Sequence, residues 1–316
     1  MGNFTLTDYR ATLEAVACRM LLNQRIDPSW EEIQEWLRVQ SDHLTAIRQI
    51  VKNGEVISLN DKGQVERLVF RHDRVRAWIL SDTIARLMQT SQLDDFDLSN
   101  PFFADVIGAA LADSKIPVEI VEKARISNPL ALFYALKTFR ESKLEIHIAV
   151  LEAINRWLSK EETHSRSNNS LRWAALRVLS QTESSCVPFI AKQFREQPLV
   201  ALEARFRNGD VNAGIRLCFR LSPGVSAPWR DLQIDHVKIR FGATLYQHLD
   251  EFLKRPDLSS SERCGGLRLA GHLAEPVLTN AIITCWASDP DKSVCLTDYL
   301  WASARCSDHE PNPLLD

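Results

Sequence analysis

Apolar residues recur at three- and four-residue spacing along most of this chain, which is the pattern of amphipathic helices. The first such stretch runs from about Asp8 to Asn23. Its apolar face comprises Leu13, Val16, Ala17, Met20 and Leu21. A second helix is expected from Trp30, behind the capping sequence Asp27-Pro28-Ser29, and a third from Ser41 to Asn53. The pattern therefore predicts that the chain opens with three helices.

The periodicity changes after Gly54, which stands where a left-handed residue commonly ends a helix. Residues 55–59 and 66–70 are short β-branched or apolar runs. The segment Asn60-Asp61-Lys62-Gly63-Gln64 joins them, and this composition favours a β-hairpin. Three helices followed by a hairpin are typical of a winged helix, so we expect a winged-helix-like domain over residues 1–92.

Behind the hairpin the chain reads as a succession of helices. Residues 93–100 carry three aspartates and are expected to form a linker. Pro, Gly, Ser and Asn separate the later helical stretches, residues 159–170 read as a polar loop, and residues 222–240 read as irregular. The expected helices lie at about 73–89, 101–113, 117–126, 129–141, 145–159, 171–181, 184–195, 198–206, 210–221, 243–254, 262–273, 276–287 and 292–305.

Two of these helix pairs resemble each other. Residues 174–194 match residues 265–286 at an offset of 91 positions, which is two repeats of about 45 residues and fits a HEAT-type array. We therefore expect a mainly all-α fold in which a winged helix with a small β-hairpin precedes a HEAT-like α-solenoid over residues 101–308. Residues 309–316 would be a tail or a truncated repeat.

Composition and charge indicate what kind of protein this chain is. The chain has 316 residues, of which 45% are hydrophobic and 25% charged, as in a globular protein. Its formal net charge of −3 gives no global attraction to nucleic acid or to an anionic membrane. Neither a secretory signal nor an apolar run of transmembrane length is present, which indicates a cytoplasmic protein without a membrane partner. The seven cysteines are scattered, so we expect buried reduced thiols rather than zinc ligands or disulfides.

The sequence contains no complete catalytic motif. It has no P-loop, no dinucleotide-binding glycine pattern, no zinc-protease motif and no nucleophile elbow. The adjacent glycines Gly265 and Gly266 fall inside a predicted helix, where close helix packing explains them. We therefore expect a protein that is not an enzyme and that binds no cofactor by itself.

One segment does point to binding chemistry. His72 stands between the second predicted strand and the helix that begins near Asp73, and Arg71, Arg74 and Arg76 surround it. Helix N-termini attract anions through unpaired N–H groups and the helix dipole. Asp73 would cap the helix while His72 points outward to a terminal phosphate. The alternative is that His72 is an ordinary capping or surface histidine.

The segment Phe70-Arg71-His72-Asp73-Arg74-Val75-Arg76 resembles the His-Asp motif that ends the winged helix of STAND-type NTPases, the NACHT and NB-ARC group. Residues 267–273 and 298–304 resemble the helical repeats behind bacterial members. In that family a P-loop ATPase module precedes the winged helix, and the motif histidine contacts the β-phosphate of bound ADP and holds the inactive form. The resemblance implies this role for His72, with Asp73 as its companion.

The Walker lysine, the magnesium ligands and the ATPase core of that family are missing here. The resemblance therefore implies a regulatory and ligand-sensing segment that works with an ATPase module in trans and shares its ADP or ATP. The repeats would bind a protein partner or trigger, and the winged helix would couple that event to the nucleotide state. The implied setting is bacterial signalling or defence.

Two alternatives remain open. As a DNA-binding winged helix, the chain would use Arg48 and Lys52 on the third helix and Lys62 and Arg67 on the wing, although phosphate contacts usually need more cations on one face. His43, Gln49 and Asn53 are further candidates for contacts to bases or phosphates on the third helix. As a stand-alone scaffold, the chain would bind proteins on the concave face of its repeats.

Overall fold

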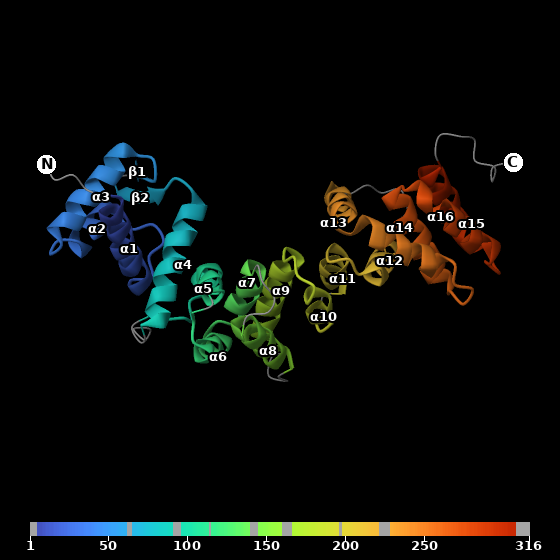
Figure 1. Cartoon of the computed structure of the whole chain (residues 1–316), viewed down its shortest axis with the longest axis horizontal. Coiled ribbons are helices and arrows are strands. Elements are labelled where there is room, and N and C mark those ends of the chain that lie inside the picture. Colours follow the sequence, from blue (N-terminus) through green and yellow to red (C-terminus); the bar gives the residue numbers. More distant parts are fainter. Residues whose placement is uncertain are drawn as a thin grey trace. The chain divides into compact units, whose positions relative to one another are not determined.

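The computed structural model describes residues 5–61, 65–90, 96–113, 115–139, 145–159, 166–195, 198–220 and 228–307. It is 75% helix and 4% strand, with one two-stranded antiparallel sheet (Figure 1), which confirms the mainly helical fold class. The chain forms two compact units, Met1–Asn168 and Asn169–Asp316. The boundary predicted at residues 93–100 falls inside the first unit, and the predicted tail at 309–316 lies outside the described residues.

The first unit begins with three helices and a hairpin. They are α1 (Leu6–Leu22), α2 (Trp30–Trp36), α3 (Ser41–Asn53), β1 (Ile57–Asp61), β2 (Glu66–Phe70) and then α4 (Asp73–Gln89). Helix α1 packs against both α3 and α4, and the apolar stripe on its middle turns is buried as predicted. The first strand starts two residues later than expected, because the ladder opens with the pair Ile57 and Phe70.

Local signals set several helix ends in this part of the chain. Ser29 and Glu32 form a reciprocal capping box at the start of α2. Gly54 ends α3 with φ of 67°, and its N–H donates to the carbonyl of Ile50 at 3.0 Å. This left-handed conformation confirms the expectation from the sequence, since a side chain would strain it.

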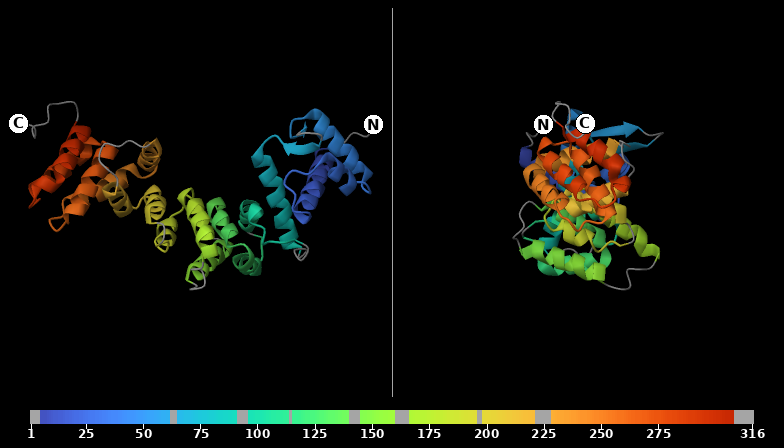
Figure 2. Two further views of the ribbon diagram at one scale, coloured as in Figure 1. Left: turned by 180° about the vertical axis from the view of Figure 1, so that it is seen from behind. Right: turned by 90° about the vertical axis from the view of Figure 1, so that its right-hand side faces the viewer.

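The first unit continues with shorter helices. They are the 3-10 turn η2 (Pro101–Phe103), α5 (Ala104–Leu111), α6 (Val118–Ser127), α7 (Pro129–Thr138) and α8 (Glu145–Ser159). Helix α5 contacts α4 and α7, and α8 contacts α6 and α7. These helices, cyan to green in Figures 1 and 2, bury the fully enclosed Phe133 of α7 edge-on against Trp157 of α8.

The second unit is entirely helical where it is described. Its elements are α9 (Arg166–Ser180), α10 (Val187–Ala191), α11 (Pro198–Arg207), α12 (Val211–Phe219), α13 (Pro228–Leu253), α14 (Ser260–Leu273), the 3-10 turn η4 (Pro276–Leu278), α15 (Thr279–Ala287) and α16 (Lys292–Cys306). Helix α14 packs against both α12 and α16, and an apolar core runs continuously from α11 to α16.

Two sequence expectations about irregular segments are wrong. Residues 222–240 were expected to be irregular, yet 228–240 form the first half of the long helix α13. Pro228 suits the first turn of a helix, and Ile234, Val237 and Leu245 continue one buried stripe. The expected polar loop at 159–170 is helical over residues 166–170, while 160–165 lie outside the described residues.

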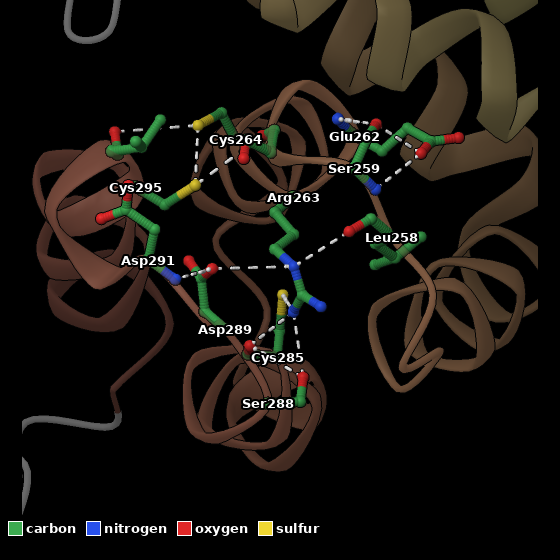
Figure 3. A network of polar contacts seen from close by, with 12 residues as sticks. Leu258, Ser259, Glu262, Arg263, Cys264, Cys285, Ser288, Asp289, Asp291 and Cys295 are labelled. Carbon is green, nitrogen blue, oxygen red and sulfur yellow. Dashed lines mark hydrogen bonds and ion pairs between the residues drawn. The ribbon is translucent and has the colours of Figure 1, made fainter.

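A buried arginine lies at the centre of the second unit (Figure 3). Arg263, at the start of α14, is only 2% exposed. Its guanidinium donates to the carbonyl of Cys285 and to the hydroxyl of Ser288, both at 2.9 Å, and Asp289 lies 3.9 Å away. A buried charge is tolerated only when its donors are satisfied. Arg263 therefore ties the beginning of α14 to the end of α15.

The cysteines behave as the sequence predicts. All seven are free, five are buried in the second unit, and Cys18 and Cys186 are half-buried. The sulfur atoms of Cys264 on α14 and Cys295 on α16 are 2.8 Å apart (Figure 3). Burial raises the pKa of both thiols, which keeps them protonated and unreactive.

The close approach of α14 to α12 yields a stability prediction. A Cβ at Gly265 would lie 2.5 Å from the carbonyl oxygen of Ile215, whereas a Cβ at Gly242 in α13 would meet nothing nearer than 3.6 Å. Gly265→Ala should lower the free energy of unfolding by about 1–3 kcal/mol through overpacking. Gly242→Ala should raise it by about 0.5–1 kcal/mol through helix propensity. Thermal unfolding of the full chain measures both changes in the free energy of unfolding. Equal effects of the two substitutions would contradict the close packing of α14 against α12 at Gly265.

Candidate functional site

The histidine singled out by the sequence is the N-cap residue of α4. His72 has φ of −128° and ψ of 122°, is exposed, and makes no capping hydrogen bond with its side chain. Within the described part of the chain, no acceptor lies within hydrogen-bond reach of the N–H groups of Asp73 and Arg74. The start of α4 therefore presents free backbone donors to solvent beside an unengaged imidazole.

The charged residues around His72 are also turned to solvent. Arg71 and Arg74 are exposed, and Asp73, whose side chain is 88% exposed, pairs with Arg76 at 3.2 Å. Asp73 was expected to cap the helix, but the N-cap is His72 and Asp73 occupies the first turn. An acid there is still favourable, because it faces the positive end of the helix dipole. Two arginines are left without a carboxylate partner among the described residues.

A hollow of about 750 Å³ lies on the same unit, between α1, α3 and α4. Its lining is mainly apolar and includes Leu13, Ile50, Val56 and Ile79. Trp78 lines it while remaining 53% exposed. Trp78 follows His72 by six residues, which is about 9 Å along a helix axis. His72 and the part of the hollow lined by Trp78 therefore both lie at the first turns of α4.

Four alternating charges fix α1 to α4 beside this hollow. Glu14 on α1 accepts from Arg10 at 2.8 Å and from Arg86 at 2.6 Å. Asp82 on α4 lies 3.2 Å from Arg10 and 3.5 Å from Arg86. Arg10 also lies over the ring of Trp78, 5.5 Å from its centroid. The square of charges thus orients the aromatic wall of the hollow.

The central carboxylate of this square has a depressed pKa. Burial alone would raise the pKa of Glu14, but hydrogen bonds and charge from Arg10 and Arg86 outweigh that effect. The pKa of Glu14 therefore lies below its ordinary value of 4.5. The sequence analysis missed this network and the hollow, because their members are 72 residues apart and carry no local signature.

The residues proposed for DNA binding are only partly available. Arg48 and Lys52 are exposed on α3, whereas Arg67 donates to the carbonyl of Asp27 at 2.9 Å. Lys62 lies outside the described residues.

Two of the three polar side chains of α3 that could reach bases are turned inward, whereas Asn53 is exposed. His43 lies 2.9 Å from the hydroxyl of Thr12, and Gln49 accepts from the hydroxyl of Tyr9 at 2.7 Å. These two contacts hold α3 to α1, so within the described residues the outer face of α3 keeps few groups for a nucleic acid.

Other classes of site are not found in the described residues. No group of three or more His, Cys, Asp or Glu side chains there could hold a metal ion. None of the described helices is long and apolar enough to cross a membrane. No known protein family, curated protein or solved structure matches the chain. The functional argument therefore rests on the residues themselves.

The charge square predicts a pH-dependent stability. Glu14→Gln should lower the free energy of unfolding by about 1–2 kcal/mol near neutral pH, because two arginines lose their shared carboxylate. Since the folded-state pKa is depressed, this contribution is complete above pH 4.5 and is lost as pH falls through the folded-state pKa. The difference between wild type and variant should therefore shrink in acid. Chemical denaturation from neutral pH to about pH 3 measures it, and a constant difference would contradict the assignment.

Proposed function

We propose that this chain is the regulatory and ligand-sensing segment of a STAND-type NTPase system. Residues 1–92 would act as its winged helix, and the helices from residue 101 onward as HEAT-like repeats. The ATPase module would reside on another chain. The proposal rests on the exposed His72 at the amino end of α4. Among the described residues, its side chain makes no capping hydrogen bond, the N–H groups beside it are free, and two nearby arginines have no carboxylate partner.

This arrangement has the chemistry that a bound diphosphate requires. The unpaired N–H groups of the first turn and the helix dipole favour an anion at the start of α4. The imidazole of His72 can donate a hydrogen bond to a β-phosphate oxygen, and Arg71 and Arg74 add positive charge around it. The site would need a second module, because no cluster of side chains among the described residues could hold the magnesium ion. A nucleotide bound by a second module would meet that need.

The hollow beside His72 offers a place for that module to dock. Its lining is mainly apolar, and the exposed face of Trp78 is the kind of aromatic anchor that interfaces bury. A partner seated there would bring its nucleotide toward the start of α4. Helix α4 would then carry both the docking surface and the phosphate contact. The winged helix would in this way couple docking of the module to contact with its nucleotide.

The trigger would bind on the second unit. Large apolar side chains stand exposed on several of its helices, among them Phe189 on α10, Ile239 on α13 and Leu300 on α16. Such side chains are available to a protein partner. The DNA-binding alternative has less support, because Arg48 and Lys52 are the only cations among the described residues of α3, and His43 and Gln49 face α1.

The proposal predicts a loss of ADP on mutation of one histidine. If a P-loop ATPase encoded beside this gene forms a complex with the chain, His72→Ala should release ADP that the wild-type complex retains through desalting. Because His72 is exposed and unbonded, the free energy of unfolding should change by less than about 0.5 kcal/mol. Nucleotide content is measured by chromatography of the denatured complex. Unchanged ADP retention would overturn the role of His72.

A matched pair of arginine variants distinguishes the proposed nucleotide role from DNA binding. Arg74→Gln, at the start of α4, should also weaken ADP retention, whereas Arg48→Gln, on α3, should leave it unchanged. DNA binding predicts the reverse order, with Arg48→Gln weakening a salt-sensitive interaction with duplex DNA. Measuring both properties on both variants assigns the surface that is used.

A further inference from the structure

A second cluster of charges lies in the unit formed by Asn169–Asp316. Glu183, in the loop before α10, lies within ion-pair distance of three basic side chains. It is 3.7 Å from Arg207 at the end of α11, 3.5 Å from His236 and 3.3 Å from Arg240, both on α13. One carboxylate therefore faces three basic groups from two helices.

The carboxylate is held loosely. None of its three contacts is as short as the neighbouring pair between Arg205 and Asp210, whose atoms are 2.8 and 2.9 Å apart. The side chain of Glu183 is also 47% exposed, whereas those of Arg207, His236 and Arg240 are each less than one-third exposed. Glu183 can therefore turn to solvent, while the basic groups stay where the helices hold them.

Several polar atoms in this cluster are buried and have no hydrogen-bond partner among the described residues. They are Nε of Arg207, Nε2 of His236 and Oε1 of Gln233. Gln233, His236 and Arg240 are three and four residues apart, so they share one face of α13. A buried polar atom without a partner costs about 1–3 kcal/mol. A ligand that supplies these partners would recover that free energy.

We propose that this cluster binds a phosphate group. A carboxylate is already present, and its two oxygens leave Arg207 and His236 unsatisfied. A phosphate group has three or four acceptor oxygens and a larger charge, and in its protonated form it can donate to Gln233. Binding would displace Glu183 toward solvent. This inference does not depend on the proposed nucleotide role of His72, which lies in the other unit.

The titration of His236 supports a testable pH dependence. Burial, together with the charges of Arg207 and Arg240, lowers the pKa of His236 and outweighs the opposing effect of Glu183. The ring is therefore neutral at pH 7, and a bound anion would favour its protonated form. Sulfate, which does not titrate in this range, should bind more tightly as pH falls below the ordinary histidine value of 6.5.

Calorimetric titration of the full chain with inorganic phosphate, at constant ionic strength, tests the site. One saturable site is expected. Arg207→Gln and Arg240→Gln should each weaken binding by about tenfold or more, as expected for a lost charge-assisted hydrogen bond. Arg216→Gln removes an exposed arginine of α12 outside the cluster and should change nothing. Phenyl phosphate binding as tightly as inorganic phosphate would assign the site to phosphate esters, and weaker binding would assign it to the free ion.

Glu183→Gln is the decisive variant, because the proposal predicts a gain. Removing the competing charge should tighten phosphate binding by about threefold to tenfold, an effect that misfolding cannot imitate. Absence of saturable binding, unchanged affinity in Glu183→Gln, or equal losses in Arg207→Gln and Arg216→Gln would overturn the proposal.

Discussion

Most helices of this chain are too short to be stable alone, and the structure depends on their covering one another's apolar faces. Helix α5 has 8 residues, α11 has 10 and α12 has 9, whereas isolated helices shorter than about 12–15 residues are marginal in water. Their order therefore comes from tertiary packing. The tight approach of α14 to α12 at Gly265 is one example, and the enclosed Phe133 against Trp157 is another.

Networks of polar side chains join neighbouring helices in both units. Arg263 joins α14 to α15, and Glu14 joins α1 to α4 through Arg10 and Arg86. Breaking the network of Arg263 is costly, because its charge would be left buried without partners, whereas the arginines that pair with Glu14 are about half exposed. The second network positions α4, the helix at whose start His72 and Trp78 lie. The rigid frame of the first unit therefore presents the proposed phosphate contact.

Sequence periodicity predicted the helical elements well but not the sites between them. Gly54 was predicted to end α3 because its backbone requirement is local, and the buried cysteines followed from ordinary burial preferences. The first half of α13 is not evident from the sequence. Ile234 and Val237 have helical spacing, but the prolines and glycine just before them are typical of an irregular segment. The networks of Glu14, Arg263 and Glu183 could not be foreseen. The fold brings distant partners together, such as Arg263 and Cys285 at 22 residues and Glu14 and Arg86 at 72 residues, and no local motif marks these pairs.

In the proposed function, this chain completes a nucleotide switch whose ATPase lies on another polypeptide. A search for a P-loop ATPase encoded next to the gene comes first. The mass of the purified full chain mixed with that ATPase is then measured by size-exclusion chromatography with light scattering in the presence of ADP. The account predicts a stoichiometric complex that carries ADP. A chain that elutes alone, without nucleotide, would contradict it.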